Sequence, residues 1–557
     1  FRRVLFRSAE EFLAARFGKR INHKTYVYIS DGGIQEEISQ GAGRIAGYLG
    51  LKNLIMFYDA NSVQLSTRCG AVTDEDTGDK YKAWGWKVVT INGNDPEAIR
   101  HALKNAQNET EAPTLIIGKT LMGKGIVDAN GEPFDDRTCI HGQPVGASGA
   151  DFNKTVAHLG GNPENPFEIF PEVKEYYAKK LAEKSQIAKQ RKAEDAKWAS
   201  ENPELAKKLQ QYLNDDFEVP ALSELDFEKP TATRGASGKV LGALYGKYEN
   251  LVVASADLSN SDKTDGFLAK TKAFTKGDFT GSFLQAGVAE LSMAALCVGM
   301  ALHGGVRPLC GTFFVFSDYM KPVIRVAALM RTPALFLYTH DSFRVGEDGP
   351  THQPIEHEAQ IRLMEQLDNH AGKQSTLVLR PADGYETIEA YRTALNNKEC
   401  PTVLIMSRQN IKTLPQGDNA SQLARAAKLN KGAYVVSQTK AGNPDVVLVA
   451  DGSEVSTLQD AAPIIAEKTG KNIRVVSMIS PRLFLNQGEA YKNEILPQSA
   501  KTFGLTAGLP SVFCTVIPNL ENVLGLSHFG DSAPAGVLDE KFGFKPEIVA
   551  DKIVAKL

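Results

Sequence analysis

The chain alternates short apolar runs with longer stretches in which apolar residues recur at helical spacing. The first clear case comprises apolar runs at residues 26–29 and 54–58, separated by a helical pattern over residues 35–49. Two strands joined through one helix lie parallel in the same sheet, with a right-handed crossover. The pattern therefore predicts a strand, helix, strand unit, which is the building block of an α/β domain.

The same alternation continues through the chain and predicts a fold class of three doubly wound α/β domains with mostly parallel sheets. We expect further strands at residues 87–91, 114–119, 251–256, 334–338, 376–379, 402–406, 445–450 and 472–477. We expect helices at residues 77–84, 96–107 and 233–248, from Gln285 to Leu302, and in the segments that lead to Leu329 and Thr469.

Composition shifts divide the chain into residues 1–161, a charged helical linker at 162–225, a second domain at 226–418 and a third at 419–557. Acidic and basic residues interleave in the linker, which favours a solvated connecting helix over a nucleic-acid-binding arm. Residues 1–8 are basic and apolar but lack the apolar core and cleavage site of a signal peptide. We interpret them as foreign sequence joined to a domain that begins incomplete.

The overall composition of the 557 residues, with 42% hydrophobic and 23% charged, is that of a soluble globular protein. A net charge of -3 gives no general attraction to nucleic acid or to an anionic membrane. No apolar run approaches the roughly 18 to 20 residues that span a bilayer. The six scattered cysteines are typical of reduced thiols, so we expect a cytoplasmic protein without nucleic-acid or membrane partners.

Polar residues follow the first two predicted strands, where Asp31 comes after one strand and Asn61 and Val63 come after the next. The carboxyl ends of parallel strands meet at one sheet edge, where open α/β sheets bind ligands. A carboxylate, an amide oxygen and a backbone carbonyl are hard donors that suit Mg²⁺ or Ca²⁺ with a bound phosphate. The alternative is ordinary turn chemistry, because Asp, Asn and Gly are common turn residues.

The Asp31-Gly32 pair, Glu36 and the Tyr-Asp-x-Asn turn that ends at Asn61 resemble the diphosphate signature of thiamine diphosphate enzymes, although Ser30 stands where Gly is usual. From about Ala9 to its end, the chain resembles the transketolase family. Eight further segments carry this resemblance, in order and spacing: 232–234, 255–258, 312–316, 339–342, 346–353, 407–410, 527–534 and 542–544.

The resemblance implies transfer of a two-carbon ketol unit from xylulose 5-phosphate to ribose 5-phosphate or erythrose 4-phosphate, as in the pentose phosphate pathway. It implies thiamine diphosphate as cofactor and Mg²⁺, or Ca²⁺ or Mn²⁺, held by Asp31, Asn61 and the Val63 carbonyl. Gly32 permits close backbone approach. It also implies a homodimer in which the diphosphate domain of one subunit faces the pyrimidine domain of the other.

Glu290 lies in the apolar stretch 286–293, where a lone carboxyl group is costly to ionise and its pKa should rise. By resemblance, this carboxyl is catalytic and hydrogen-bonds the aminopyrimidine ring of the cofactor. The structural alternative is a glutamate at a helix start, which the helix dipole favours.

The resemblance gives roles to the remaining candidate residues. An aromatic wall against the pyrimidine comprises Phe313, Phe316 and Tyr319, although such a stripe also suits a core. His141 and His352 are catalytic candidates that line the substrate channel with His340, and His141 also lies near the diphosphate; on its motif alone, His141 is a loop residue. Asp348 binds the C2 hydroxyl of the substrate, and the sugar phosphate is held by Arg234, Ser261, His340 and Arg408.

The Gly-Pro-Leu-Gly-Gln-Gly segment of the family and additional active-site histidines do not occur in this sequence. We therefore expect an N-terminally truncated member. Two alternatives stay open. One is a ketol transferase of the dihydroxyacetone synthase type, which uses formaldehyde as acceptor, and the other is an inactive truncated homologue that acts as a scaffold.

Overall fold

The computed structural model describes residues 7–415 and 417–557, and the chain divides into two compact units. Unit 1 extends to Asn214 and also includes Thr275–Phe279, whereas unit 2 comprises Asp215–Phe274 and Thr280–Leu557. The interpretation of residues 1–8 as foreign falls mostly outside the described residues, since α2 (Arg7–Phe17) is the first element. It stays a prediction.

Unit 1 is built on a four-stranded parallel sheet of β1 (Thr25–Ser30), β2 (Leu54–Ala60), β3 (Lys87–Asn92) and β4 (Thr114–Lys119), in the order β1-β2-β4-β3. Ser30 pairs with Asp59, so Asp31 and Asn61 emerge together at the carboxyl edge. The strands of the first domain are confirmed to within a few residues. Its helices are α3 (Asp31–Gln35), α4 (Glu37–Leu49), α5 (Thr77–Ala83), α6 (Pro96–Gln107) and α7 (Phe152–His158).

Local sequence explains where these helices begin and break. The Asp95 carboxylate accepts a hydrogen bond from the Glu97 amide, and Pro96 occupies the first helical turn, where its missing N–H costs nothing. The helix predicted over residues 35–49 is confirmed as α4, although it begins at Glu37, because Glu36 has an extended ψ of 132° and separates α4 from the short helix α3. This break leaves Asp31 as the first residue of its own short helix.

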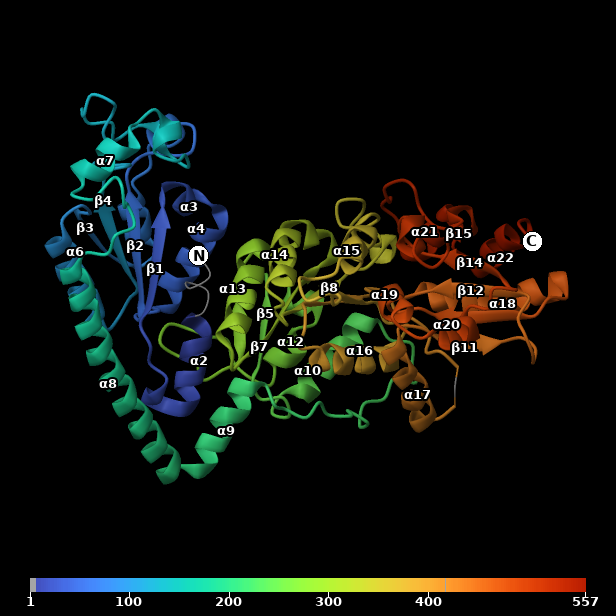
Figure 1. The fold of residues 1–557 in the computed structure, drawn as a ribbon. Helices are drawn as coiled ribbons and strands as arrows, with labels where there is room; N and C mark the ends of the chain where they lie inside the picture. The colour runs from blue at the N-terminus through green and yellow to red at the C-terminus, as the bar shows by residue number, and fades with distance from the viewer. Residues whose placement is uncertain (1–6, 416) are drawn as a thin grey trace. The chain divides into compact units, whose positions relative to one another are not determined.

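The charged linker forms two helices, α8 (Pro171–Glu201) and α9 (Pro203–Asn214), both labelled in Figure 1. The break falls at Asn202, because the residue before a proline is disfavoured in a helix. None of the 31 residues of α8 is buried. Its mixed charges therefore cover a solvated helix, as the interleaved pattern predicts.

Unit 2 contains two sheets (Figure 1). The first is fully parallel, in the order β6 (Phe283–Gln285), β5 (Leu251–Ser255), β7 (Arg307–Phe313), β8 (Leu335–Thr339), β10 (Thr402–Met406) and β9 (Leu377–Leu379). The second has the order β11 (Tyr434–Gln438), β13 (Ile473–Ser477), β12 (Val446–Ala450), β14 (Lys501–Leu505) and β15 (Val523–Leu524), with only β11 antiparallel. The fold class of three mostly parallel α/β sheets is confirmed.

The main helices of unit 2 cover these sheets. They are α10 (Thr233–Leu244), α13 (Glu290–His303), α14 (Ser317–Leu329), α15 (His357–Glu365), α16 (Gly384–Asn396), α18 (Glu454–Thr469), α21 (Ala535–Phe542) and α22 (Pro546–Val554). The helix predicted to begin at Gln285 is wrong at its start, since Gln285 ends β6 and the helix begins at Glu290. Gly287 has a φ of 72°, which a right-handed helix does not allow.

A cluster of buried arginines and carboxylates joins the parts of unit 2 that carry its two sheets. Arg380 pairs with Asp341 at 2.7 Å and with Asp451 at 2.8 Å, and Arg362 pairs with Asp451 at 2.6 Å. Arg344 contacts Asp539 at 2.7 Å. Fully buried charges persist only when they are paired in this way. The proposed boundary between residues 418 and 419 would therefore separate two strongly bonded parts.

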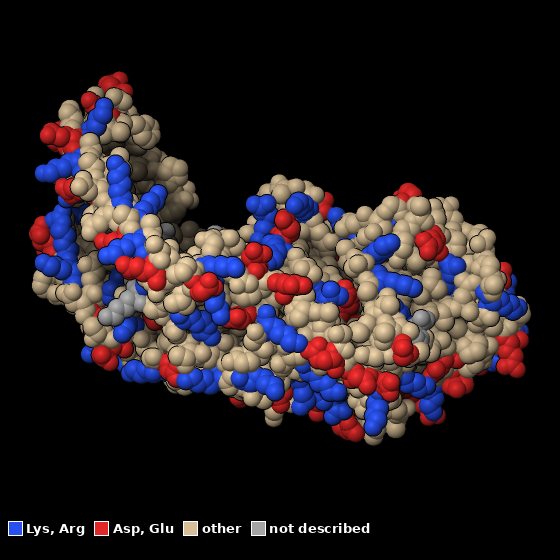
Figure 2. Space-filling view, turned by 90° about the horizontal axis from the view of Figure 1, so that it is seen from below, with Lys and Arg blue, Asp and Glu red and all other residues tan. Residues whose placement is uncertain are grey.

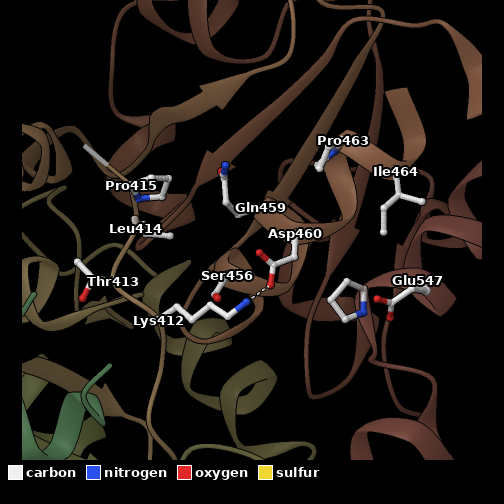
Figure 3. A pocket seen from close by; sticks show the side chains of 11 residues that line it. Lys412, Thr413, Leu414, Pro415, Ser456, Gln459, Asp460, Pro463, Ile464 and Glu547 are labelled. Carbon is white, nitrogen blue, oxygen red and sulfur yellow. Dashed lines mark hydrogen bonds and ion pairs between the residues drawn. The ribbon is translucent and has the colours of Figure 1, made fainter. Parts of the chain in front are cut away.

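The surface shows no broad area of one charge on the face drawn in Figure 2, where Lys and Arg are interspersed with Asp and Glu. No helix of the described residues is long and apolar enough to cross a membrane. In unit 2, residues 412–415 and α18 line a cavity of about 470 Å³. Figure 3 shows the Lys412 ammonium directed at the Asp460 carboxylate there, and none of the predicted site residues lines this cavity.

Candidate active site

In unit 1 Asp31 is 2% exposed, and the hydrogen-bond donors that reach its carboxylate from the described residues are neutral. The Tyr58 hydroxyl donates to Oδ1 at 2.7 Å, and the backbone amides of Asn61 and Ser62 donate to Oδ2 at 3.1 and 3.2 Å. The Cys69 thiol lies 3.3 Å from Oδ1. Ser62 holds a φ of 62°, so the turn after β2 is wound tightly around this carboxylate.

The oxygen atoms around this turn fit a divalent cation. No Lys or Arg of the described chain pairs with Asp31, and a buried carboxylate without a cation is otherwise costly. The side-chain oxygen of Asn61 lies in the same turn, where it accepts from the Val63 amide at 3.0 Å. Asp31 also borders a cavity of about 650 Å³, which Lys82 and Lys119 line as well. The structure thus brings together three of the predicted metal and cofactor residues, Asp31, Asn61 and Val63.

His141 follows a short 3₁₀ turn of unit 1, and its Nδ1 is buried without a hydrogen-bond partner among the described residues. A Cβ on its neighbour Gly142 would lie 3.4 Å from Leu65, two residues after Val63. The loop that carries His141 therefore lies near Leu65, shortly after the turn that holds Asn61 and Val63. Gly32 is exposed, and a Cβ there would meet no atom within 4 Å, so its backbone is open to a ligand.

In unit 2 the predicted phosphate-binding residues Arg234, Ser261 and His340 converge at the carboxyl ends of the strands. Nη1 of Arg234 donates to the Ser261 carbonyl at 2.7 Å, lies 3.2 Å from its hydroxyl, and lies 3.2 Å from Nε2 of His340. Burial, followed by the charge of Arg408, lowers the pKa of Arg234. Two guanidinium groups held this close favour an anionic ligand.

His340 is buried directly after β8 with a φ of 65°, which is unusual for a residue other than glycine. Burial lowers its pKa to about 3, and the charges of Arg234 and Arg408 add to the effect. The imidazole is therefore neutral at neutral pH. Because a guanidinium only donates, Nε2 must accept from Arg234, and Nδ1–H donates to the Thr339 hydroxyl at 2.8 Å.

The three aromatic candidates form a continuous series. Phe313 lies parallel to Phe316 with ring centroids 6.0 Å apart, and Phe316 stacks on Tyr319 at 6.1 Å. Phe313 also contacts the His340 ring at 3.7 Å, and His352 lies edge-on to Phe316 at 5.7 Å. Tyr319 is 59% exposed, so this end of the series presents a free face, unlike a core stripe.

Glu290 is the first residue of α13 and is 8% exposed. A helix start is what the structural alternative required, because the dipole favours a carboxylate there. Near-complete burial is what the catalytic interpretation required. Val288, two residues earlier, is 79% exposed, so an apolar side chain faces solvent in the turn that leads to α13. The catalytic role of Glu290 stays a prediction.

Asp348 and His352 belong to one loop, residues 346–353, which we call the substrate loop. The Asp348 side chain is exposed, and the Thr351 hydroxyl lies 2.9 Å from Nδ1 of His352. The charge of Asp348 raises the pKa of Arg234 slightly, against the larger effects of burial and Arg408. The loop is therefore part of the same polar centre as the phosphate-binding residues.

Sequence reasoning missed Asp262, which supports this centre. Its buried carboxylate accepts from the Ser255 hydroxyl at 2.8 Å and from the Thr264 hydroxyl at 2.7 Å, and burial raises its pKa to about 6. It thereby fixes the turn that carries Ser261. The signal was present, since Asp262 directly follows Ser261 and lies shortly after the quoted segment 255–258.

Comparison with known proteins gives three consecutive family matches. Residues 2–218 match the transketolase thiamine diphosphate binding domain, residues 229–413 the transketolase pyrimidine binding domain, and residues 432–545 the transketolase-like C-terminal domain. These three matches follow the order of the three sheets.

Individual relatives agree. The chain is 37% identical to the transketolase of Bacillus subtilis over 98% of its own length and 80% of that protein, and 35% identical to that of Aquifex aeolicus over 98% and 77%. Among solved structures, transketolase from Leishmania mexicana gives a TM-score of 0.89 at 30% identity, covering 100% of this chain and 80% of that one.

A transketolase from Pichia stipitis in complex with sedoheptulose-7-phosphate gives a TM-score of 0.86 at 30% identity, with coverage of 100% and 80%. Together, the consecutive domain matches and the relatives along nearly the whole chain show that the chain belongs to the transketolase family of thiamine diphosphate-binding transferases.

Proposed function

We propose that the chain transfers a two-carbon ketol unit from xylulose 5-phosphate to ribose 5-phosphate or erythrose 4-phosphate. The observation that carries the proposal is the contact of Arg234 with Ser261 and His340, beside the ring of Phe313. A cationic group next to an aromatic surface suits a substrate whose phosphate is anchored while its carbonyl end reaches the cofactor. The relative that was solved with sedoheptulose-7-phosphate supports this substrate class.

The chain's residues fit thiamine diphosphate together with Mg²⁺, or with Ca²⁺ or Mn²⁺. Asp31, Asn61 and the Val63 carbonyl would hold the metal, and Gly32 and His141 would lie against the diphosphate. When bound, the cofactor supplies a nucleophilic thiazolium carbon that accepts the ketol unit. Phe313, Phe316 and Tyr319 would pack against its pyrimidine ring, and their aligned rings leave Tyr319 exposed for that contact.

Each catalytic residue then has a defined task. Glu290, which is 8% exposed at the start of α13, would hydrogen-bond the aminopyrimidine ring of the cofactor. His352 donates hydrogen bonds to substrate oxygens or transfers protons to and from them. Asp348 accepts a hydrogen bond from the C2 hydroxyl. His340 is neutral, so it does not attract the phosphate itself but holds the Arg234 guanidinium in place through a hydrogen bond. Arg408 is the second cation that binds the phosphate.

The active form we propose is a homodimer in the cytoplasm. The metal-binding residues lie in unit 1, and Glu290 with the phosphate-binding residues lies in unit 2. A site completed between two copies of the chain would combine them, and the open surface at Val288 and Tyr319 suits such an interface. The domain division at residues 161, 225 and 418 is part of this proposal.

The test is turnover by the purified protein after loading with thiamine diphosphate and Mg²⁺. We expect sedoheptulose 7-phosphate and glyceraldehyde 3-phosphate from xylulose 5-phosphate and ribose 5-phosphate. If formaldehyde outcompetes ribose 5-phosphate, the chain is instead a ketol transferase of the dihydroxyacetone synthase type. Absence of both cofactor binding and turnover would support the scaffold alternative.

A further inference from the structure

The substrate loop is closed by the side chain of Gln353, which is 2% exposed. Its amide nitrogen carries two hydrogens, and both are used. One is donated to the carbonyl of Gly346, the first residue of the loop, at 2.9 Å. The other is donated to the carbonyl of Asp531 at 2.8 Å. A single amide thus ties both ends of the loop to a segment 178 residues further along the chain.

That segment, residues 528–534, we call the C-terminal loop. The Ser532 hydroxyl donates to the Glu347 carbonyl at 2.7 Å, and a Cβ on Gly349 would lie 3.3 Å from the Cβ of Ser532. Two hydrogen bonds therefore join the two loops, and Gly349 leaves little room for a side chain beside Ser532. The two bonds hold Glu347 and Gln353, which lie on either side of Asp348.

Gly530 makes this contact possible. A Cβ on Gly530 would lie 1.6 Å from Oε1 of Gln353, so the Gln353 side chain would have to move away and give up its present hydrogen bonds to Gly346 and Asp531. Gly346 and Gly349 hold φ values of 89° and 75°, so the substrate loop itself depends on conformations that other residues rarely adopt. Such a loop keeps one shape only if its surroundings hold it.

Neighbouring contacts anchor the same interface. Arg344 contacts Asp539 at 2.7 Å, and Phe343 packs edge-on against Phe542 and Phe544 with ring centroids 5.2 and 4.9 Å away. The C-terminal part of the chain therefore also packs against Phe343 and Arg344, which directly precede the substrate loop. Rigid support of this kind is what precise placement of a functional side chain requires.

We propose that the C-terminal loop is a positioning element that sets acceptor selectivity, with Gln353 and Gly530 as its positioning residues. The proposal rests on the proposed function, in which Asp348 binds the C2 hydroxyl of the sugar. A shifted substrate loop would misplace Asp348. The loss in kcat/KM would then be largest for an acceptor that carries the C2 hydroxyl. Selectivity for a 2-hydroxy aldose over its 2-deoxy counterpart would then depend on residues that never touch the substrate.

The test compares Gly530→Ala with Gly536→Ala. Gly536 lies in α21, and a Cβ there would meet no atom within 4 Å, which makes it a matched control. The readout is the ratio of kcat/KM for ribose 5-phosphate to that for 2-deoxyribose 5-phosphate. We expect Gly530→Ala to lower this ratio at least about tenfold, as a displaced contact group can. Ser532→Ala, which removes one exposed hydrogen bond, should lower it about threefold.

An unchanged ratio in Gly530→Ala, with both acceptors slowed equally, would overturn the proposal, because a merely structural defect acts on both substrates. A wild type that turns over neither acceptor would instead refute the proposed function. Hydrogen exchange separates the two cases without turnover. Amides of residues 346–353 should exchange faster in Gly530→Ala than in Gly536→Ala, and equal rates would also overturn the proposal.

Discussion

The guanidinium of Arg234 donates a hydrogen bond to Nε2 of His340 across 3.2 Å and so fixes the neutral imidazole in one tautomer. The same nitrogen of Arg234 reaches Ser261. The side chain is therefore held in place through Nη1, and no hydrogen bond from its Nε or Nη2 to the described residues is seen, which suits the proposed phosphate contact.

Replacement of Arg234 with Met should raise KM for phosphorylated acceptors by ten- to a hundredfold, the effect of losing a charged hydrogen bond worth roughly 1.5 to 3 kcal/mol. Non-phosphorylated glycolaldehyde should be affected far less. Steady-state kinetics with both acceptors measures the difference. Equal losses for both would place Arg234 outside the phosphate site.

The lowered pKa of His340 makes a prediction about pH. Its pKa falls from 6.5 in the unfolded chain to about 3 in the fold, so the folded state resists protonation. Above pH 6.5 this shift does not change the free energy of unfolding. As the pH falls from 6.5 toward 3, the free energy of unfolding decreases by up to about 5 kcal/mol. In His340→Gln this loss is absent. Thermal unfolding should show the variant gaining on the wild type between pH 8 and pH 5, and a constant difference would contradict the assignment.

Arg380 tests the buried cluster of unit 2. Arg380→Met removes the arginine that pairs with Asp341 and one of the two arginines that pair with Asp451, which should destabilise the protein by roughly 3 to 5 kcal/mol. Lys412→Met is the control, because its pair with Asp460 is exposed and worth about 0 to 1 kcal/mol. Chemical denaturation of both variants provides the comparison. If Arg380→Met and Lys412→Met lowered the free energy of unfolding equally, the buried cluster would contribute little to stability.

Asp31 tests the metal half of the site. Asp31→Asn keeps the shape of the side chain but removes the buried charge, so binding of Mg²⁺ with thiamine diphosphate should fall at least about a hundredfold. Asp79→Asn, on the exposed start of α5, is the control. Isothermal titration measures both variants. Wild-type affinity in Asp31→Asn would remove this residue from the metal site.

The strands that were predicted are β-branched and aromatic runs separated by turn residues, which specify them locally. Five strands were missed: β6, β7, β11, β14 and β15. The three-residue β6 depends on its sheet neighbour, and the start of α13, which was also misplaced, depends on Gly287. The helix break at Glu36 likewise has no proline or glycine at the break itself. Local pattern fixes the centre of an element better than its ends.

The candidate site divides in the same way. Arg234, Ser261 and His340 come from distant segments, and the family resemblance grouped them as the structure does. Gln353 was quoted within a motif but received no role, because its partners Gly346 and Asp531 are visible only in the fold. A contact between residues 353 and 531 leaves no periodic signal in a single sequence.

The most direct measurement of the central claim follows label from xylulose 5-phosphate that carries ¹³C at carbons 1 and 2. With ribose 5-phosphate and the protein loaded with thiamine diphosphate and Mg²⁺, the account predicts sedoheptulose 7-phosphate labelled only at carbons 1 and 2, and unlabelled glyceraldehyde 3-phosphate. Absence of labelled sedoheptulose 7-phosphate from a protein that binds both cofactor and metal would contradict it.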